Sequence, residues 1–272
     1  MRIRISHDTV YRYAAPVKSA IQMLRLTPRN HHGQFVADWR VDVQGEARVV
    51  RRDDWFGNIT HGLTIDSPIT ELSLRVTGEV ETDNQAGIVR GTVERFPPAL
   101  FLRETRLTAP DAGMVDFAAS ASGGPVNVLH RLHGLMLAVH ELVTFDTEAT
   151  DTLTTATEAF AKGHGVCQDL SHIFCACARS IGVPARYVSG YLFRSDTPVQ
   201  EATHAWAEAY VGDLGWVSFD PTNAVCATDS YVRLAIGLDY LDAAPVRGSY
   251  YGAADENMDV KLRIEDARQA QA

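Results

Sequence analysis

The 272-residue sequence predicts an α+β fold, and three observations support this class. Apolar and polar residues alternate with a period near two over about the first 100 residues, as they do in strands with one solvated face. After Pro97 and Pro98 the apolar spacing becomes helical, and strand-like alternation returns beyond residue 182. We therefore expect a β-rich domain over residues 1–100 and a mixed domain over residues 101–272.

The N-terminal domain is expected to resemble an antiparallel β-sandwich. Pro, Gly, Asn or Asp residues separate its alternating segments, which is typical of strands joined by turns. Gly57 and Asn58 mark one turn, because both residue types tolerate a positive φ. The expected strands cover residues 2–13, 36–44, 46–55, 58–65 and 72–81.

Helical spacing marks the middle of the chain. Val128, Leu132, Leu135 and Val139 follow the spacing of one apolar helix stripe. A second, short helix is expected over residues 155–161. The chain then reaches a glycine-flanked histidine and a cysteine.

A third helix is expected over residues 167–181, and a cysteine begins it. Apolar residues recur there at helical intervals until Gly182 and Pro184 end the pattern. Cys167 therefore lies in the first turn, where free N–H groups and the positive end of the helix dipole favour a thiolate. Gly163 and Gly165, just before it, would let another molecule approach the backbone.

The strand expected over residues 203–211 supplies a base for this thiol. His204 and Trp206 point to one face of that strand, and its three alanines form a flat opposite face suited to helix packing. A helix on the alanine face would leave His204 pointing away from Cys167. The two residues must therefore meet at an edge or an end of the strand.

The next strand, expected over residues 215–222, supplies a carboxylate. The short turn between the two strands places Asp220 opposite His204 to within about two residues. A carboxylate beside an imidazole fixes its tautomer and supports its cation. Cys167, His204 and Asp220 can therefore act as nucleophile, base and orienting residue.

Three blocks of this region resemble the transglutaminase-like superfamily, in its bacterial cysteine-protease-like branch. They read GHGVCQDLSHIF, GVPARYVSGY and THAWAEAYVGDLGWVSFDPTN, between residues 163 and 223. The N-terminal motifs YRYAAPV, LRLTPR and WFGN resemble the β-rich domain that accompanies this branch. The resemblance implies a papain-like core over residues 101–272, with its cysteine-bearing helix packed on an antiparallel sheet or barrel. It also implies a catalytic triad of Cys167, His204 and Asp220.

The expected function is cysteine-dependent hydrolysis of an amide bond, in a peptide or another amide-containing substrate, through a thioester. Two alternatives stay open. One is acyl transfer to an amine, as in a transglutaminase, and the other is a non-catalytic binding or assembly module. No cofactor is expected.

The backbone N–H of Cys167 is the expected donor to the oxyanion. Tyr191 and Trp206 are candidates for a second donor, although each could equally be a core aromatic. Gln168, Asp169 and His164 are further substrate-side candidates. For Asp169 the alternative is a charge that complements the helix dipole, and for His164 it is an ordinary loop residue.

Composition and charge narrow the partners. Lys and Arg number 25 against 34 Asp and Glu, and no dense basic run is present, so nucleic acid is not expected. The N-terminus builds no long apolar stretch, which favours a cytoplasmic location without a membrane partner. The oligomeric state is not predicted.

No metal site or disulfide is expected. The four cysteines, Cys167, Cys175, Cys177 and Cys226, are too few for a disulfide scaffold in a chain of this length. Cys175 and Cys177 are interpreted as core residues, and His172 as a residue on the surface of the third helix. Cysteines and histidine on one helix point around its circumference and do not converge on a metal.

Overall fold

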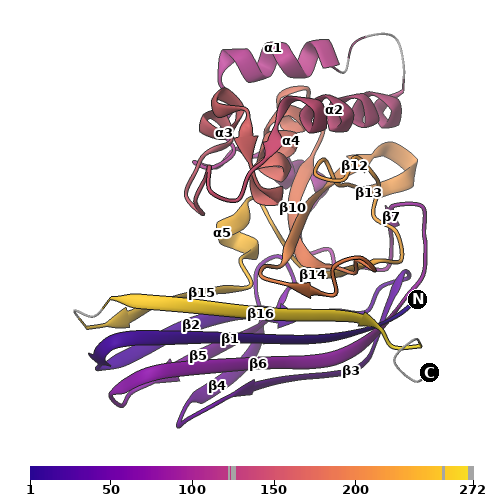
Figure 1. The fold of residues 1–272 in the computed structure, drawn as a ribbon. Coiled ribbons are helices and arrows are strands. Elements are labelled where there is room, and N and C mark those ends of the chain that lie inside the picture. Colours follow the sequence, from indigo (N-terminus) through magenta and orange to yellow (C-terminus); the bar gives the residue numbers. More distant parts are fainter. Residues whose placement is uncertain (122, 124–126, 253–254, 269–272) are drawn as a thin grey trace.

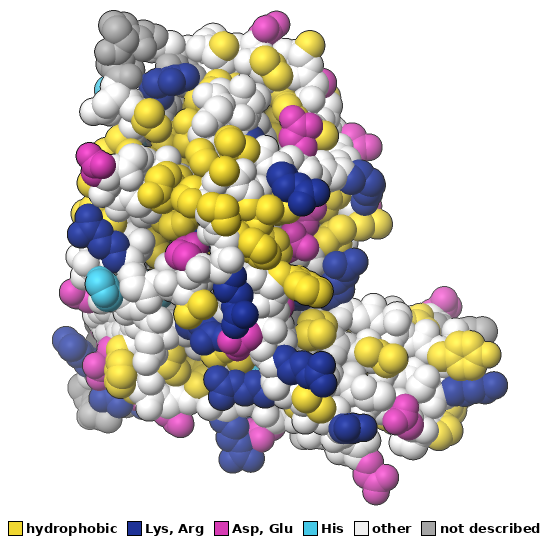
Figure 2. Space-filling model, turned by 180° about the vertical axis from the view of Figure 1, so that it is seen from behind, with side chains coloured by type: hydrophobic (Ala, Val, Ile, Leu, Met, Phe, Trp, Pro, Cys, Tyr) yellow, Lys and Arg dark blue, Asp and Glu magenta, His cyan; other side chains and the backbone are white. Residues whose placement is uncertain are grey.

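Two packed sheets form the lower part of the molecule, and a helix-covered sheet forms the upper part (Figure 1). The computed structural model describes residues 1–121, 123, 127–252 and 255–268. The predicted α+β class is confirmed. Seen from behind, one end of the lower part projects beyond the upper part and makes a concave corner with it (Figure 2).

The lower part is a β-sandwich. Its first sheet has the strand order β11-β16-β1-β6-β3, and its second sheet has the order β15-β2-β5-β4. The strands are β1 (Arg2–Val17), β2 (Ser19–Thr27), β3 (Gln34–Val43), β4 (Arg48–Asp53), β5 (Ile59–Ile65), β6 (Ile69–Thr82), β11 (Val199–Gln200), β15 (Val246–Tyr251) and β16 (Glu256–Asp266). Alternate side chains such as Ile3, Leu24 and Leu63 are fully buried between the sheets. The five expected N-terminal strands are all present, and β2 is an additional one.

The end of the chain returns to the sandwich. The strand β16 pairs antiparallel with β1, from Ile3 opposite Asp266 to Tyr13 opposite Glu256. The strand β15 pairs with β2. The predicted division into residues 1–100 and 101–272 leaves out this return, because alternation shows that a segment is a strand but not which sheet it joins.

The upper part consists of a third sheet with helices on one side (Figure 1). The sheet order is β14-β10-β12-β13-β7. Its strands are β7 (Ile88–Val89), β10 (Ala185–Leu192), β12 (His204–Val211), β13 (Gly215–Phe219) and β14 (Tyr231–Gly237). The helices are α1 (Ala112–Ala121), α2 (Val128–Leu142), α3 (Ala156–Lys162), α4 (Cys167–Ser180) and α5 (Tyr240–Ala243), with 3-10 turns at Pro98–Leu102 and Gly212–Leu214. A short parallel pair joins β8 (Thr144–Phe145) to β9 (His164–Gly165).

The helix α4 lies at the centre of the upper part. It packs on the alanine face of β12, where Ala207 and Ala209 share its apolar core. The helices α1, α2 and α3 cover its other sides. The stripe of α2 is buried at Leu132, Leu135 and Val139, but Val128 at its first turn is 37% exposed, so that part of the prediction is wrong. No helix in the described ranges is long and apolar enough to span a membrane.

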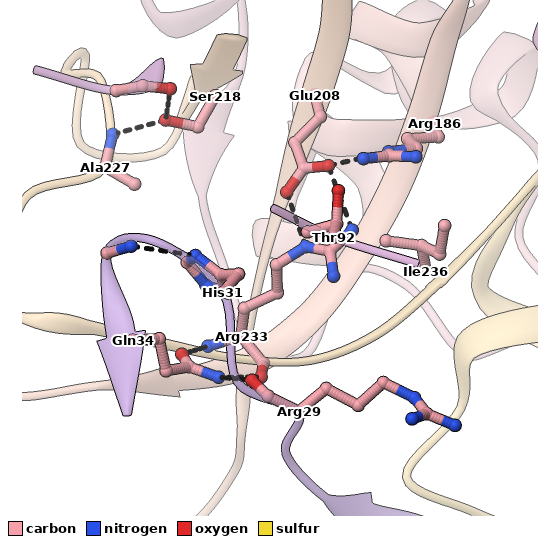
Figure 3. A network of polar contacts seen from close by, with 12 residues as sticks. Arg29, His31, Gln34, Thr92, Arg186, Glu208, Ser218, Ala227, Arg233 and Ile236 are labelled. Carbon is pink, nitrogen blue, oxygen red and sulfur yellow. Dashed lines mark hydrogen bonds and ion pairs between the residues drawn. The ribbon is translucent and has the colours of Figure 1, made fainter. Parts of the chain in front are cut away.

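A buried ion network joins the sandwich to the third sheet (Figure 3). The Glu208 carboxylate accepts hydrogen bonds from Arg186 at 2.6 Å and from Arg233 at 2.7 Å. Burial opposes the charge of Glu208, but the two guanidinium groups lower its pKa to about 2. The side chain of Gln34, from β3, accepts from the Arg233 backbone N–H at 2.8 Å and donates to its carbonyl at 2.9 Å. The two parts of the molecule therefore share polar contacts as well as apolar ones.

Candidate active site

Cys167 is the first residue of α4, and the turn before it is tightly held. The Asp169 carboxylate accepts a hydrogen bond from the Val166 backbone N–H at 2.8 Å and one from the Thr150 hydroxyl at 2.6 Å. Asp169 is buried, and burial raises its pKa in spite of these hydrogen bonds. A Cβ at Gly165 would lie 2.8 Å from the Asp169 side chain. Gly165 therefore makes room for the cap of α4, whereas the sequence suggested room for another molecule.

His204 is the first residue of β12, beyond the alanine face on which α4 packs. Its ring stacks on Trp206 with centroids 6.1 Å apart. Cys167 and His204 line the same cleft, and Cys167 interacts with the imidazole in the direction that raises its pKa. Cys167 and His204 therefore meet at the end of the strand, as the packing argument required.

Asp220 lies just beyond the β12–β13 ladder, whose last pair is Ala207 and Phe219. One of its carboxylate oxygens is 2.6 Å from the His204 Nε2 atom. The same oxygen accepts from the Tyr231 hydroxyl and from the Asn223 amide, each at 2.7 Å. Burial opposes its charge, but these partners hold the pKa of Asp220 below its usual value.

The protonation of His204 follows from these neighbours. Burial alone would lower its pKa, but the hydrogen bonds and charges of Asp220 and Cys167 outweigh burial and raise the pKa to about 10. An imidazolium beside a thiol favours the thiolate. The three groups can therefore form an ion pair of sulfur and imidazolium, with the carboxylate behind it.

A cleft of about 530 Å³ opens beside these residues. Cys167, Gln168 and His204 line it together with Tyr187, Asn223 and Tyr240. Both the sandwich-facing strand β10 and the helix α5 contribute to its walls. The cleft is large enough for several residues of an extended chain.

Comparison with known proteins places the chain in a family. Residues 3–81 match the bacterial transglutaminase-like N-terminal region, and residues 116–221 match the transglutaminase-like superfamily. The chain is 31% identical to the protein ML0607 of Mycobacterium leprae over 97% of its own length and 98% of that protein. The chain belongs to the transglutaminase-like superfamily.

Two further proteins are similar over nearly the whole chain. The protein Rv2569c of Mycobacterium tuberculosis is 28% identical over 97% of this chain and 92% of its own. A candidate cysteine protease from Cytophaga hutchinsonii has the same fold, with a TM-score of 0.78 and 24% identity over 98% of this chain and 91% of its own. Both parts of the chain therefore share their fold with this solved structure.

Two of the candidate oxyanion donors lie outside the cleft of this transglutaminase-like core. Tyr191 is fully buried, and its hydroxyl is 3.0 Å from the Nδ1 atom of His7 in the sandwich. Trp206 packs beneath His204 and Tyr231, on the same face of β12 as His204. Both are core aromatics, which was the alternative to an oxyanion donor for each residue.

The other candidates divide between the cleft and the surface. Gln168 lines the cleft, and its amide donates to the Thr152 carbonyl at 3.3 Å. His164 is half exposed on β9, and its ring is 3.7 Å from the Asp146 carboxylate. Asp169 caps α4 beneath the cleft surface. Of these three side chains, Gln168 is the one that a substrate could contact.

Three residues of the site were not among the predicted candidates. Asn223 and Tyr231 hold Asp220, and Tyr187 lines the cleft beside Cys167. Burial and then the charge of Cys167 raise the pKa of Tyr187 well above its ordinary value, so its hydroxyl keeps its proton. Tyr187 and Asn223 lie within the blocks that carry the family resemblance, which was the available signal.

His172 is not on the helix surface, so that prediction is wrong. Its side chain is fully buried between α4 and α5, and its Nε2 atom accepts a hydrogen bond from the Tyr240 backbone N–H at 2.9 Å. Burial lowers its pKa to about 3. His172 is therefore a neutral residue that links α4 to α5. It is buried because α4 is enclosed on every side.

The four cysteines are free thiols in different environments. Cys175 and Cys177 are fully buried in the core of α4, as predicted, and burial raises the pKa of each. Cys226 is half-buried, and burial raises its pKa to about 11. Within the described part of the chain, no group of three or more His, Cys, Asp or Glu side chains is arranged to hold a metal ion.

Proposed function

We propose that this protein is a cysteine-dependent hydrolase of amide bonds that acts on peptides through a thioester. The observation that carries the proposal is the alignment of Cys167, His204 and Asp220 beside one cleft, with the pKa of His204 raised by both partners. A non-catalytic binding module with the same residues would not need a charged imidazole next to a thiol at the start of a helix. A buried charge of that kind is costly and is typical of active sites.

The first half of the reaction forms the thioester. The Cys167 thiolate attacks the carbonyl carbon of the amide, and the carbonyl oxygen becomes an oxyanion. The backbone N–H of Cys167 is free of a helical partner and donates to that oxygen, together with the Tyr187 hydroxyl. His204 gives its proton to the leaving nitrogen as the carbon–nitrogen bond breaks, which releases an amine.

The second half restores the enzyme. Neutral His204 takes a proton from water, and the hydroxide attacks the thioester carbon. The carbon–sulfur bond breaks, which releases a carboxylic acid and the Cys167 thiolate. Asp220 stays ionised throughout, since its hydrogen bonds lower its pKa, and it holds the imidazolium in place. An amine in place of water would give acyl transfer by the same steps.

The first experiment measures the reactivity of each cysteine without a substrate. Iodoacetamide labelling is followed by mass spectrometry from about pH 5 to 9, in the wild type and in His204→Ala. We expect fast labelling of Cys167 well below the free-thiol pKa of about 8.5, and loss of that rate in His204→Ala. Cys226 serves as the internal control, because it is half-buried but has no imidazole partner in the site.

Two results separate the alternatives. Labelling of Cys167 at an ordinary thiol's rate in both proteins would overturn the enzyme proposal and favour a binding module. If Cys167 is activated, a peptide mixture incubated with and without hydroxylamine distinguishes hydrolysis from transfer: hydrolysis yields carboxylic acids, and transfer yields hydroxamates. A cytoplasmic location and a peptide partner remain proposals, which fractionation of the native cell and the same peptide mixture would test.

A further inference from the structure

The inward-facing side chains of β1 change character along the strand. Ile3 and Ile5 are buried apolar residues, as expected inside a sandwich. The next four inward positions are polar: His7, Thr9, Tyr11 and Tyr13. This polar half of the interior lies where the two sheets are bordered by β15 and β16.

Two further cavities adjoin the candidate active site in series. A second cavity, of about 180 Å³, shares Glu201, Thr203 and Tyr240 with the cleft that contains Cys167. A third cavity, of about 360 Å³, shares Tyr11 with the second. Strands β15 and β16, labelled in Figure 1, provide walls of the third cavity. We call the second and third cavities together the sandwich groove.

One buried polar atom of a residue that lines the third cavity lacks a partner. The Gln22 amide oxygen has no hydrogen bond to any described residue, although Gln22 is only 6% exposed, whereas the Tyr13 hydroxyl shares a hydrogen bond with the Glu256 carboxylate. Buried polar groups are nearly always hydrogen-bonded. An unpartnered amide oxygen close to a carboxylate in one cavity therefore indicates a ligand that carries hydrogen-bond donors.

The charges of the groove are acidic. Glu256 is the one charged residue among the described residues that line the third cavity, and Glu201 lies where the groove joins the cleft. Burial, and then the charge of Glu256 and its hydrogen bond with the phenol, raise the pKa of Tyr13 to about 12. The guanidinium of nearby Arg12 is paired with Glu71 on the outer face and does not line the cavity. A carboxylate with phenol and amide groups suits a cation that carries several N–H donors.

We propose that the sandwich groove binds the chain of an extended peptide substrate, and that the third cavity accepts a lysine or arginine side chain of that peptide. The proposal rests on the proposed function, since the peptide reaches Cys167 from the groove. It gives the N-terminal sandwich a task in recognition, and it names the substrate class as peptides with a basic residue several positions from the scissile amide.

The test uses probes that react with Cys167 and carry a peptide of chosen length. Each probe has an iodoacetyl group, a run of glycines and a C-terminal lysine amide, and its matched probe has norleucine in place of lysine. The Cys167 thiolate displaces iodide and forms a carbon–sulfur bond. The ratio of the two labelling rates, measured within one protein, cancels any change in the reactivity of Cys167. An extended glycine adds about 3.5 Å of reach.

For the shortest pair we expect the lysine and norleucine probes to label Cys167 at nearly equal rates. Once the lysine reaches the third cavity, the rate ratio should rise to about ten, because a charge-assisted hydrogen bond changes binding by about that factor. Glu256→Gln should remove the rise. Asp259→Asn should keep it, because Asp259 is on the same strand but pairs with Arg12 on the outer face.

A ratio of one at every length, or a rise that survives Glu256→Gln, would overturn the proposal. Slow iodoacetamide labelling independent of His204 would instead overturn the proposed function, and the ratio would still report on the groove.

Discussion

The Asp220 carboxylate is held by more partners than any other polar group at the cleft. One oxygen meets His204, Tyr231 and Asn223, and the other accepts from the Thr222 and Asn223 backbone N–H groups at 2.9 and 3.2 Å. A carboxylate with this many donors stays ionised and cannot rotate. The orientation of His204 is therefore fixed through its Nε2 atom.

Tyr187 allows a test of oxyanion stabilisation. In Tyr187→Phe we expect kcat/KM for a cleaved peptide to fall about 100-fold, because one donor to the oxyanion is lost. Iodoacetamide labelling of Cys167, which forms no oxyanion, should change far less. The matched control is Tyr191→Phe on the same strand, whose hydroxyl bonds to His7. An equal loss of kcat/KM in both variants would contradict a role for Tyr187 at the oxyanion.

Glu208 allows a test of the buried ion network. In Glu208→Gln we expect the free energy of unfolding at pH 7 to fall by about 3 kcal/mol, because Arg233 loses its counter-charge and buried Arg186 keeps only that of Glu94. In the folded protein the pKa of Glu208 is lowered to about 2. The contribution of Glu208 to the free energy of unfolding is therefore fully present above the pKa of about 4.5 in the unfolded chain, and it is lost as the pH falls toward 2.

The difference between the two proteins should therefore narrow below about pH 4.5. Urea unfolding at several pH values measures it. Glu71→Gln is the matched control, since its pair with Arg12 is more than half exposed on both sides and should contribute less than about 1 kcal/mol. A difference that stays constant down to pH 3 would contradict the assignment of the charge to Glu208.

Sequence spacing was sufficient to propose Cys167, His204 and Asp220 as one group. The three residues lie at the start of a helix and at the ends of two adjacent strands, and these positions leave few places where the side chains can come together. It could not separate Tyr187 from Tyr191. These tyrosines are four positions apart on β10, so alternation puts both on one face. Which one lies beside Cys167 and which beside His7 depends on how the sandwich packs under the sheet.

The start of α4 is the element on which the site depends. Gly165→Ala would place a Cβ 2.8 Å from the Asp169 side chain and displace the cap of the helix. We expect a loss of about 1 to 3 kcal/mol in the free energy of unfolding and slower labelling of Cys167. Thermal unfolding and the iodoacetamide rate measure the two effects.

The matched control for this substitution is Gly62→Ala on β5. The nearest atom to a Cβ there is the Val50 carbonyl oxygen at 3.9 Å, which is an ordinary contact. We expect this variant to be as stable as the wild type. If Gly165→Ala behaves in the same way, the cap does not position Cys167.

Most elements with a clear period were predicted, although the alternating strand β2 was missed, and several elements without a period were not predicted. The strand β14 is buried along nearly its whole length, so its sequence does not alternate. The helix α1 is rich in alanine and buries only Met114 and Ala118, which is too short a stripe to stand out. The expected single buried face of α4 understated its burial, because three helices and a sheet enclose it.

At the scale of the molecule, the last strand of the chain stabilises the first domain. Ile264 on β16 is fully buried between the sheets, whereas its neighbour Arg263 points outward. Ile264→Ala should therefore cost about 2 to 5 kcal/mol in the free energy of unfolding, and Arg263→Ala less than about 0.5 kcal/mol. Urea unfolding measures both. Equal stability of the two variants would contradict the placement of β16 in the sandwich.

The pairing of β1 with β16 also brings the two ends of the described chain together, and the Ala267 backbone N–H donates to the Arg2 carbonyl at 2.8 Å. The polypeptide is thus nearly a closed ring. A circular permutant that joined these ends and began just before β15 would place all the long strands of the sandwich in one uninterrupted stretch. In that permutant the sandwich and the helix-covered sheet would become consecutive segments of the chain.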